Sequence, residues 1–167
     1  MNRIAIIGSG GSGKSTLAKK LGKKLNISVW HLDRLHWNPN WTPTSKEEQI
    51  ELQETLVTEE KWIIDGNYNS TLDIRLEAAD TIIFLDIHRL ICTYRVLKRM
   101  IQYINRTRPD MREGCIEKLD LKFLKWIWKY PLTKKPYVLT KLKKFSKEKN
   151  IIILKSQKEV QNWLDRV

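Results

Sequence analysis

The sequence predicts a three-layer α/β fold, in which helices cover both faces of one parallel β-sheet. Five short apolar runs are the strand candidates, and four are nearly continuous in apolar residues, as in strands buried on both faces. Patterns with helical spacing lie between these runs, and such alternation is typical of right-handed crossovers. A length of 167 residues with 41% hydrophobic residues suits one core, so we expect a single domain over residues 1–167. The five runs are Ile4–Ile7, Ser28–Leu32, Trp62–Ile64, Thr81–Leu85 and Ile151–Leu154.

The first run leads directly into a glycine-rich loop with the pattern Gly8-x-x-x-x-Gly13-Lys14-Ser15, and a helical pattern follows up to Leu25. Glycines let such a P-loop turn with its amide N–H groups pointing inward, which makes a phosphate cradle at the positive end of the helix. Because strand, spacing, lysine and serine are all present, the loop predicts binding of a nucleoside triphosphate. We expect the phosphates to contact Gly8, Ser9, Gly10, Gly11, Ser12, Gly13, Lys14, Ser15 and Thr16.

Three residues of the loop have expected roles of their own. The ammonium group of Lys14 is expected to reach the β and γ phosphates, and the hydroxyl of Ser15 is expected to bind Mg²⁺. Thr16 is expected to bond the α phosphate.

Three aspartates follow predicted strands, at the sheet edge where P-loop enzymes place the acid that serves the metal. Asp65 closes the third run and meets a turn at Gly66, so we expect it to bind Mg²⁺ directly or through water. Asp33 follows the second run and is the candidate to orient the acceptor or take its proton, although holding the metal is an alternative role. Asp86 ends the fourth run before a helix, where an N-cap is the favoured interpretation.

Two helix starts are marked by capping boxes. After Pro43, Thr44 or Ser45 is the expected N-cap, because a glutamate lies three residues further on in each case. Ser156 precedes Glu159 by the same spacing, and an apolar stripe then predicts the final helix.

The long interval between the fourth and fifth runs, about residues 89–149, is predicted to form a helical lid, with Pro109, Pro131 and Pro136 as breaks. Its residues 91–150 hold 17 Lys or Arg against 5 Asp or Glu, which accounts for the whole net charge of +12. Two stripes are predicted within it. The lysines at 118, 122, 125 and 129 should share one helical face, beside a core-facing stripe of Leu121, Leu124 and Trp128.

Arginines of the lid are candidates to stabilise a phosphoryl group in transfer, because fixed cations balance the charge that spreads over it. Arg95 and Arg99 are four residues apart and share a helical face. Arg108 lies between Arg106 and Arg112 near Pro109, and we expect Arg95, Arg99 and Arg108 to act in catalysis.

An acceptor site is expected after the third run. Asn67 and Tyr68 have side chains that suit hydroxyl groups, and Arg75 suits an anionic group, so all three are candidate substrate contacts together with Asp33.

Composition excludes several classes of protein. The N-terminus has too few apolar residues for a signal peptide and no run approaches the ~20 residues that cross a bilayer, so we expect a soluble, cytoplasmic protein. Cys92 and Cys115 lack CxxC spacing and are expected as free thiols. The histidines at 31, 36 and 88 lack metal-ligand spacing and are expected to be structural. The basic segment attracts polyanions, but no recognised DNA-reading motif is present.

The P-loop, the aspartates after the second and third runs, and the arginine-rich lid together resemble the adenylate-kinase and shikimate-kinase branch of P-loop kinases. The whole chain more closely resembles bacterial DNA topology modulation proteins (FlaR-related). This resemblance implies a sheet with strand order 2-3-1-4-5 and binding of ATP with Mg²⁺. Unlike in adenylate kinases, Asp65-Gly66 is not followed by Pro-Arg, and the lid has no four-cysteine zinc set. The matching stretches are residues 8–16, 31–33, 62–68, 79–86, 107–111 and 123–128.

These observations lead to one main hypothesis, an ATP-dependent phosphotransferase that acts on a small molecule, either nucleotide-like or a hydroxylated metabolite. In it Ser15 and Asp65 hold Mg²⁺, Asp33 orients the acceptor, and the lid arginines close over the phosphoryl group. The alternative is a nucleotide-dependent regulator that contacts DNA through its basic segment. A hydrolase acting on water needs a water-positioning residue, and the sequence indicates none. The acceptor, the choice between ATP and GTP, and the oligomeric state stay open.

Overall fold

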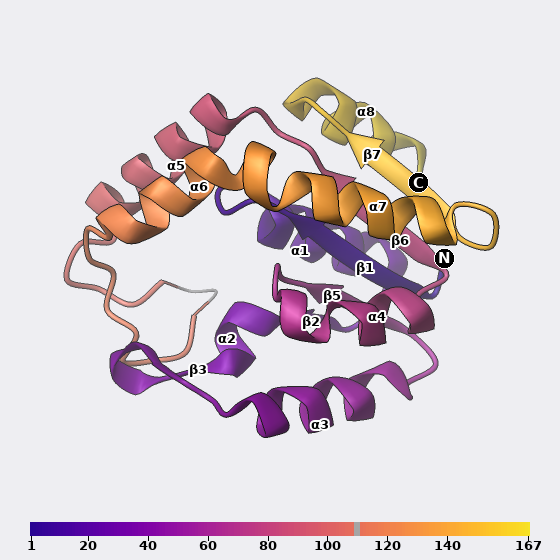
Figure 1. Cartoon of the computed structure of the whole chain (residues 1–167), viewed down its shortest axis with the longest axis horizontal. Coiled ribbons are helices and arrows are strands. Elements are labelled where there is room, and N and C mark those ends of the chain that lie inside the picture. Colours follow the sequence, from indigo (N-terminus) through magenta and orange to yellow (C-terminus); the bar gives the residue numbers. More distant parts are fainter. Residues whose placement is uncertain (109–110) are drawn as a thin grey trace.

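The computed structural model describes residues 1–108 and 111–167, with a five-stranded parallel sheet at the centre (Figure 1). The strand order is β2-β5-β1-β6-β7, and every neighbouring pair is parallel. Counted along the chain, the sheet strands run 2-3-1-4-5, so the expected order is confirmed. The strands are β1 (Arg3–Gly8), β2 (Val29–His31), β5 (Trp62–Asp65), β6 (Thr81–Leu85) and β7 (Asn150–Leu154).

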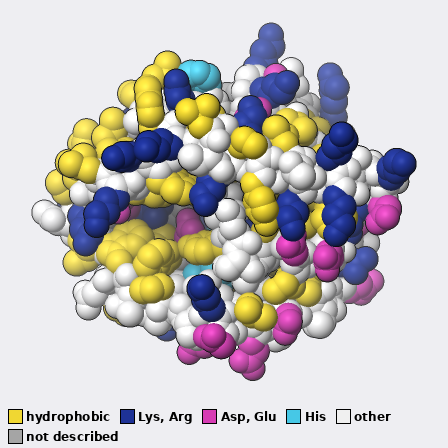
Figure 2. Space-filling view, in the orientation of Figure 1, with side chains coloured by type: hydrophobic (Ala, Val, Ile, Leu, Met, Phe, Trp, Pro, Cys, Tyr) yellow, Lys and Arg dark blue, Asp and Glu magenta, His cyan; other side chains and the backbone are white. Residues whose placement is uncertain are grey.

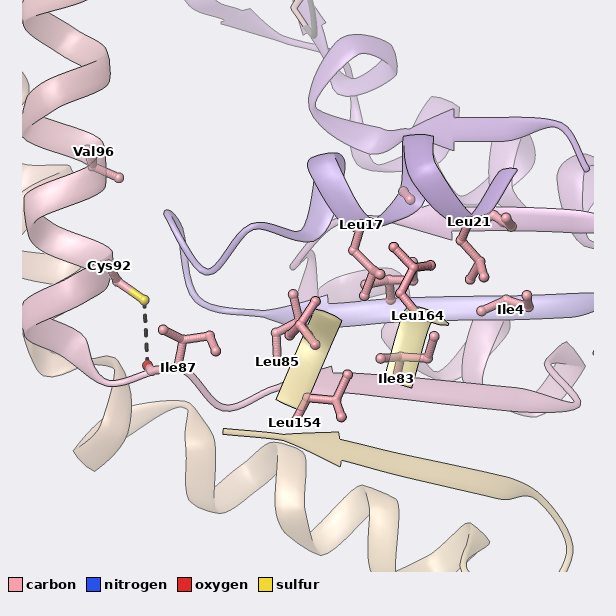
Figure 3. Packing of buried hydrophobic residues seen from close by; sticks show 14 of the residues in the cluster. Ile4, Leu17, Leu21, Ile83, Leu85, Ile87, Cys92, Val96, Leu154 and Leu164 are labelled. Atoms are coloured by element: carbon pink, nitrogen blue, oxygen red, sulfur yellow. Dashed lines mark hydrogen bonds between the residues drawn. The ribbon is translucent and has the colours of Figure 1, made fainter. Parts of the chain in front are cut away.

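Alternate residues of the strands pack into two separate cores, one on each face of the sheet. Ile4 and Ile6 of β1 join residues of α1 (Lys14–Leu25) and α8 (Gln157–Arg166), as Figure 3 shows for Leu17, Leu21 and Leu164. The intervening residues of β1 join a second cluster with α3 (Lys46–Val57), α4 (Leu72–Ala78) and α7 (Lys135–Phe145). Each buried aliphatic side chain contributes about 1.5–3 kcal/mol, which explains why the strands are apolar on both faces.

Both predicted capping boxes mark real helix starts. The hydroxyl of Ser45 accepts from the Glu48 amide at 3.1 Å, and the Glu48 carboxylate accepts from the Ser45 amide at 2.9 Å. At the start of α8, the hydroxyl of Ser156 accepts from the Glu159 amide at 3.2 Å. The Asp86 prediction is wrong, because α5 (Arg89–Gln102) is capped by His88, and Asp86 instead pairs with Lys135 at 2.7 Å.

A small unit that the sequence analysis does not predict follows β2. Leu32 belongs to the short helix α2 (Leu32–His36) and not to the strand. The antiparallel strands β3 (Trp37–Asn38) and β4 (Thr42–Pro43) then flank the 3₁₀ turn η1 (Pro39–Trp41). A second 3₁₀ turn, η2 (Asn69–Thr71), leads into α4.

The lid is helical as expected, with α5, then α6 (Leu121–Thr133) and α7, and residues 103–108 and 111–120 are irregular (Figure 1). Pro131 lies inside α6 and Pro136 in the first turn of α7, whereas Pro109 and Asp110 are outside the described residues. In the described ranges, no helix has the length and apolar character to span a membrane.

The predicted side-chain faces of α6 are right in part. The helix begins after its N-cap Asp120, so Lys118 is not part of it, but the lysines at 122, 125 and 129 are exposed as expected. Leu124 packs against the core, whereas Trp128 is 43% exposed and Leu121 is exposed too, and the buried residues are Ile127 and Tyr130. The outer surface of α5 and α6 consequently mixes hydrophobic with basic side chains (Figure 2).

Candidate active site

The phosphate loop lies between β1 and α1, with the lid helices packed directly against it. Gly11 has φ +74°, and a Cβ added there would lie 2.4 Å from the backbone oxygen of Cys92 in α5. A Cβ at Gly10 would lie 2.6 Å from the ring of Phe123 in α6. The loop therefore needs glycine both for its turn and for the close approach of α5 and α6.

The side chain of Lys14 is folded onto its own loop, where it donates to the carbonyl oxygen of Ser9 at 2.9 Å. Burial lowers the pKa of Lys14, and the carboxylates of Asp33 and Asp65 oppose that shift. Lys14 lines the cavity described below together with Gly10, Gly11, Gly13, Ser15 and Thr16. Gly8, Ser9 and Ser12 are not part of that lining, and Ser9 and Ser12 are buried.

Ser15 and Asp65 meet as the metal hypothesis expects. The hydroxyl of Ser15 donates to Oδ2 of Asp65 at 2.7 Å, and Nδ1 of His31 lies 2.5 Å from Oδ1 of the same carboxylate. The Asp65 side chain is only 3% exposed, and the contacts of both of its carboxylate oxygens fix its orientation. Among the described residues no three His, Cys, Asp or Glu side chains form a metal group. Mg²⁺ is usually held by one or two carboxylates with phosphate oxygens and water, so this oxygen pair fits it.

The acceptor candidates Asp33 and Tyr68 are joined in one hydrogen-bonded chain. The Tyr68 hydroxyl donates to Oδ1 of Asp33 at 2.8 Å and accepts from Nε1 of Trp37 at 2.9 Å. Burial, reinforced by the Asp33 charge, raises the pKa of Tyr68, so the phenol stays protonated and keeps donating. Asn67 lines the same cavity, and its amide nitrogen and oxygen are buried without a hydrogen-bond partner among the described residues.

The three catalytic arginine candidates reach the cavity. Arg95 donates to the Ser12 carbonyl oxygen at 3.5 Å, which places it beside the phosphate loop. Arg108 and Arg99 both approach the carboxylate of Glu117, at 2.6 Å and 3.9 Å. Sequence reasoning missed Glu117, which is 3% exposed, because nothing in the sequence distinguishes it from the other acids of the basic segment.

Arg75 corrects one expectation. Its guanidinium is fully buried, donates to Oε1 of Gln53 at 2.8 Å and to the Gly66 carbonyl oxygen at 3.1 Å, and does not line the cavity. Burial lowers the pKa of Arg75 to about 10, and Asp65 opposes the shift. Arg75 therefore has a structural role: its N–H groups donate to buried oxygen atoms and so stabilise the turn after β5.

One cavity of about 640 Å³, a volume typical of small-molecule sites, is lined by Lys14, Ser15, Asp33, Asn67, Tyr68 and the three lid arginines, but not by Asp65 or Arg75. Aromatic residues form much of the wall away from the phosphate loop. They come from the small unit after β2, from the turn after β5 and from α6, and they are Trp37, Trp41, Tyr68, Phe123 and Trp126. The arrangement can hold phosphates at one end and a ring-bearing or apolar molecule at the other.

Comparison with known proteins identifies the fold. No family model matches the sequence, and no curated protein matches it. A shikimate kinase structure from Bacteroides thetaiotaomicron is 18% identical with a TM-score of 0.56, over 99% of this chain and 95% of that one. A shikimate kinase from Acinetobacter baumannii in complex with shikimate is 11% identical with a TM-score of 0.61, over 99% and 90%. A deoxyadenosine kinase from M. mycoides is 15% identical with a TM-score of 0.53, over 98% and 96%.

These similarities show a kinase-like P-loop fold. They lend no support to the resemblance to DNA topology modulation proteins. At such identities they leave the reaction and the acceptor to be argued from the site.

Proposed function

We propose that this protein is a kinase that transfers the γ-phosphoryl group of Mg-ATP to a hydroxyl group of a small molecule. One observation carries the proposal: the phosphate loop, Ser15 and the Asp33 carboxylate line a single cavity, and Ser15 bonds Asp65 next to it. Nucleotide binding needs the loop and the Ser15–Asp65 pair, and transfer to a hydroxyl group also needs a base beside them, which Asp33 with its Tyr68 hydrogen bond would supply. The kinase fold of the solved neighbours is consistent with this function.

At the nucleotide end, the loop amides and Lys14 would bind the phosphates, and Ser15 and Asp65 would hold Mg²⁺. The bound ion would neutralise charge on the β and γ phosphate oxygens. Arg95 lies beside the loop, and Arg99 and Arg108 reach the same cavity from the lid. Their fixed positive charges balance the charge that spreads over the phosphoryl group during transfer.

At the acceptor end, Asp33 accepts the proton of the attacking hydroxyl group. The hydrogen bond from Tyr68 holds one oxygen of this carboxylate, which leaves the other oxygen for the acceptor. Asp33 lines the same cavity as Lys14 and the loop glycines. The two ends of the reaction are thus adjacent.

The test is ADP release from Mg-ATP in the presence of nucleosides, nucleotides, hydroxylated metabolites or DNA, with Lys14→Ala as background. We expect one class of small molecule to stimulate release, and we expect Lys14→Ala to lose that stimulation. Stimulation by DNA alone would instead favour the regulator, since the lid charge by itself accounts only for salt-dependent attraction to a polyanion.

A further inference from the structure

An aromatic wall begins where the acceptor hydroxyl must lie. Tyr68 contacts Asp33 with its hydroxyl group, Trp37 contacts Tyr68 in turn, and the rings of Trp37 and Trp41 meet edge to face with centroids 5.7 Å apart. All of these residues line the same cavity as Lys14. The wall therefore leads from the reacting end of the cavity toward the place where the body of the acceptor would lie.

The backbone at Trp41 has an energetically unfavourable conformation. Its φ is +57° and that of Asn40 is +61°, a left-handed backbone that is rare for a bulky side chain and costs on the order of 1–3 kcal/mol. Two hydrogen bonds to the lid hold this backbone in place. The indole nitrogen of Trp41 donates to the carbonyl oxygen of Ile116 at 2.7 Å, and the backbone N–H of Asn40 donates to the carbonyl oxygen of Gly114 at 3.0 Å. Strain of this kind clusters at ligand clamps.

The charges that line the acceptor part of the cavity are balanced. Apart from Lys14 and Arg95, the charged side chains that line the cavity among the described residues are three basic and three acidic ones. They are Arg99, Arg108 and Lys118 against Asp33, Glu117 and Asp120. Arg99 and Arg108 are both engaged with Glu117, and Arg75 does not reach the cavity. This part of the cavity therefore has no net positive charge among the described residues, so it gives no preference for a carboxylate or phosphate on the acceptor.

We propose that the acceptor is an uncharged molecule that joins a hydroxyl group to a planar ring system, as nucleosides do, and that its ring stacks on Trp41 and meets Trp37 edge to face. This inference rests on the proposed kinase function for the role of the hydroxyl group, while the stacking of the ring is a binding property. Stacking of a heterocycle on an aromatic side chain contributes about 1–3 kcal/mol, so the wall has a measurable effect on affinity.

The test uses two assays on the full chain: calorimetric binding without ATP, and ADP release with Mg-ATP. The probes are adenosine, guanosine, cytidine and thymidine, against shikimate and glycerate, which carry hydroxyl groups and a carboxylate but no aromatic ring. The variants are Trp41→Leu, which removes the ring, and Trp41→Phe, which keeps one. Trp128→Leu is the matched control, because Trp128 is 43% exposed on α6, packs against Arg89 and does not line the cavity.

We expect at least one nucleoside to bind and to stimulate ADP release. We expect Trp41→Leu to raise the KM of that nucleoside about tenfold, with a smaller change in the KM of ATP, and Trp41→Phe to recover most of the loss. Trp128→Leu should leave both unchanged.

Nucleoside binding that needs Trp41 but stimulates no ADP release would uphold the aromatic site and overturn the kinase function. Stimulation by shikimate or glycerate, or equal effects of Trp41→Leu and Trp128→Leu, would overturn the acceptor class while leaving a kinase in place. Failure of all four nucleosides to bind also overturns it.

Discussion

Single side chains of the site show where sequence reasoning succeeds and where it fails. The motif predicted a loop of which Lys14 and Ser15 line the cavity, although Gly8, Ser9 and Ser12 do not. The position of Asp65 after a strand predicted its meeting with Ser15, because parallel strands bring their C-terminal ends to one edge. Arg75 was misplaced because a charged residue on a short helix gives no sign of which buried oxygens its donors must satisfy. Glu117 and Trp41 were missed because each acts through contacts between distant segments, Glu117 with Arg108 and Trp41 with Ile116.

His36 gives a residue-scale prediction about pH. Its ring is 1% exposed and packs edge-on against Tyr68 at 4.3 Å. Burial, with a smaller effect of the Arg75 charge, lowers the pKa of His36 from 6.5 to about 4. Between these pH values the unfolded chain binds the proton and the folded chain does not, so stability falls as pH drops from 6.5 to 4, by up to about 3 kcal/mol.

Urea unfolding at a series of pH values checks this, with His36→Gln and the exposed His88→Asn compared. We expect the acid loss of stability to shrink in His36→Gln and to persist in His88→Asn. Equal pH profiles for wild type and His36→Gln would show that His36 is not the group responsible.

Among the elements, the sheet and most helices were predictable because their signals are local: continuous apolar runs for the strands and serine–glutamate pairs for the starts of α3 and α8. The unit formed by α2, β3 and β4 was not, since two-residue strands exist through tertiary contacts such as the bond between Arg112 and Asn38. The register of α6 also depends on its packing against α5 and the loop, which a repeating pattern of leucine and lysine does not reveal.

The packing of α5 and α6 on the phosphate loop yields an element-scale prediction. Gly11→Ala would place a methyl group 2.4 Å from the backbone oxygen of Cys92, in a conformation unfavourable for alanine. The backbone of α5 cannot rotate aside as the end of a flexible side chain can. The helix must therefore move away from the loop. We expect Mg-ATP affinity to fall at least tenfold, measured by calorimetry.

Gly22→Ala is the control, because its added Cβ would lie 2.3 Å from Val29 in the core and not at the loop. It should lower stability while the folded fraction binds Mg-ATP normally. Similar ATP affinities in the two variants would contradict the view that α5 shapes the loop.

For the whole molecule, the cavity depends on parts of the chain that are far apart in sequence. The phosphate loop comes from the connection after β1. Asp33, Trp37 and Trp41 come from the connection after β2, and the arginines come from the lid. Hydrogen bonds between residues 38–41 and 112–116 join the second of these parts to the third. The proposed transfer therefore depends on contacts between all three parts of the chain.

The fate of the γ-phosphoryl group tests this account most directly. ATP labelled at that position is incubated with Mg²⁺, the protein and a nucleoside, and the label is traced to the nucleoside or to inorganic phosphate. We predict label on the nucleoside hydroxyl, reduced about 100-fold or more in Asp33→Asn through loss of the base, and unchanged in Asp73→Asn, which alters an acid 49% exposed on α4. Label found only in inorganic phosphate, at equal rates in wild type and Asp33→Asn, would contradict it.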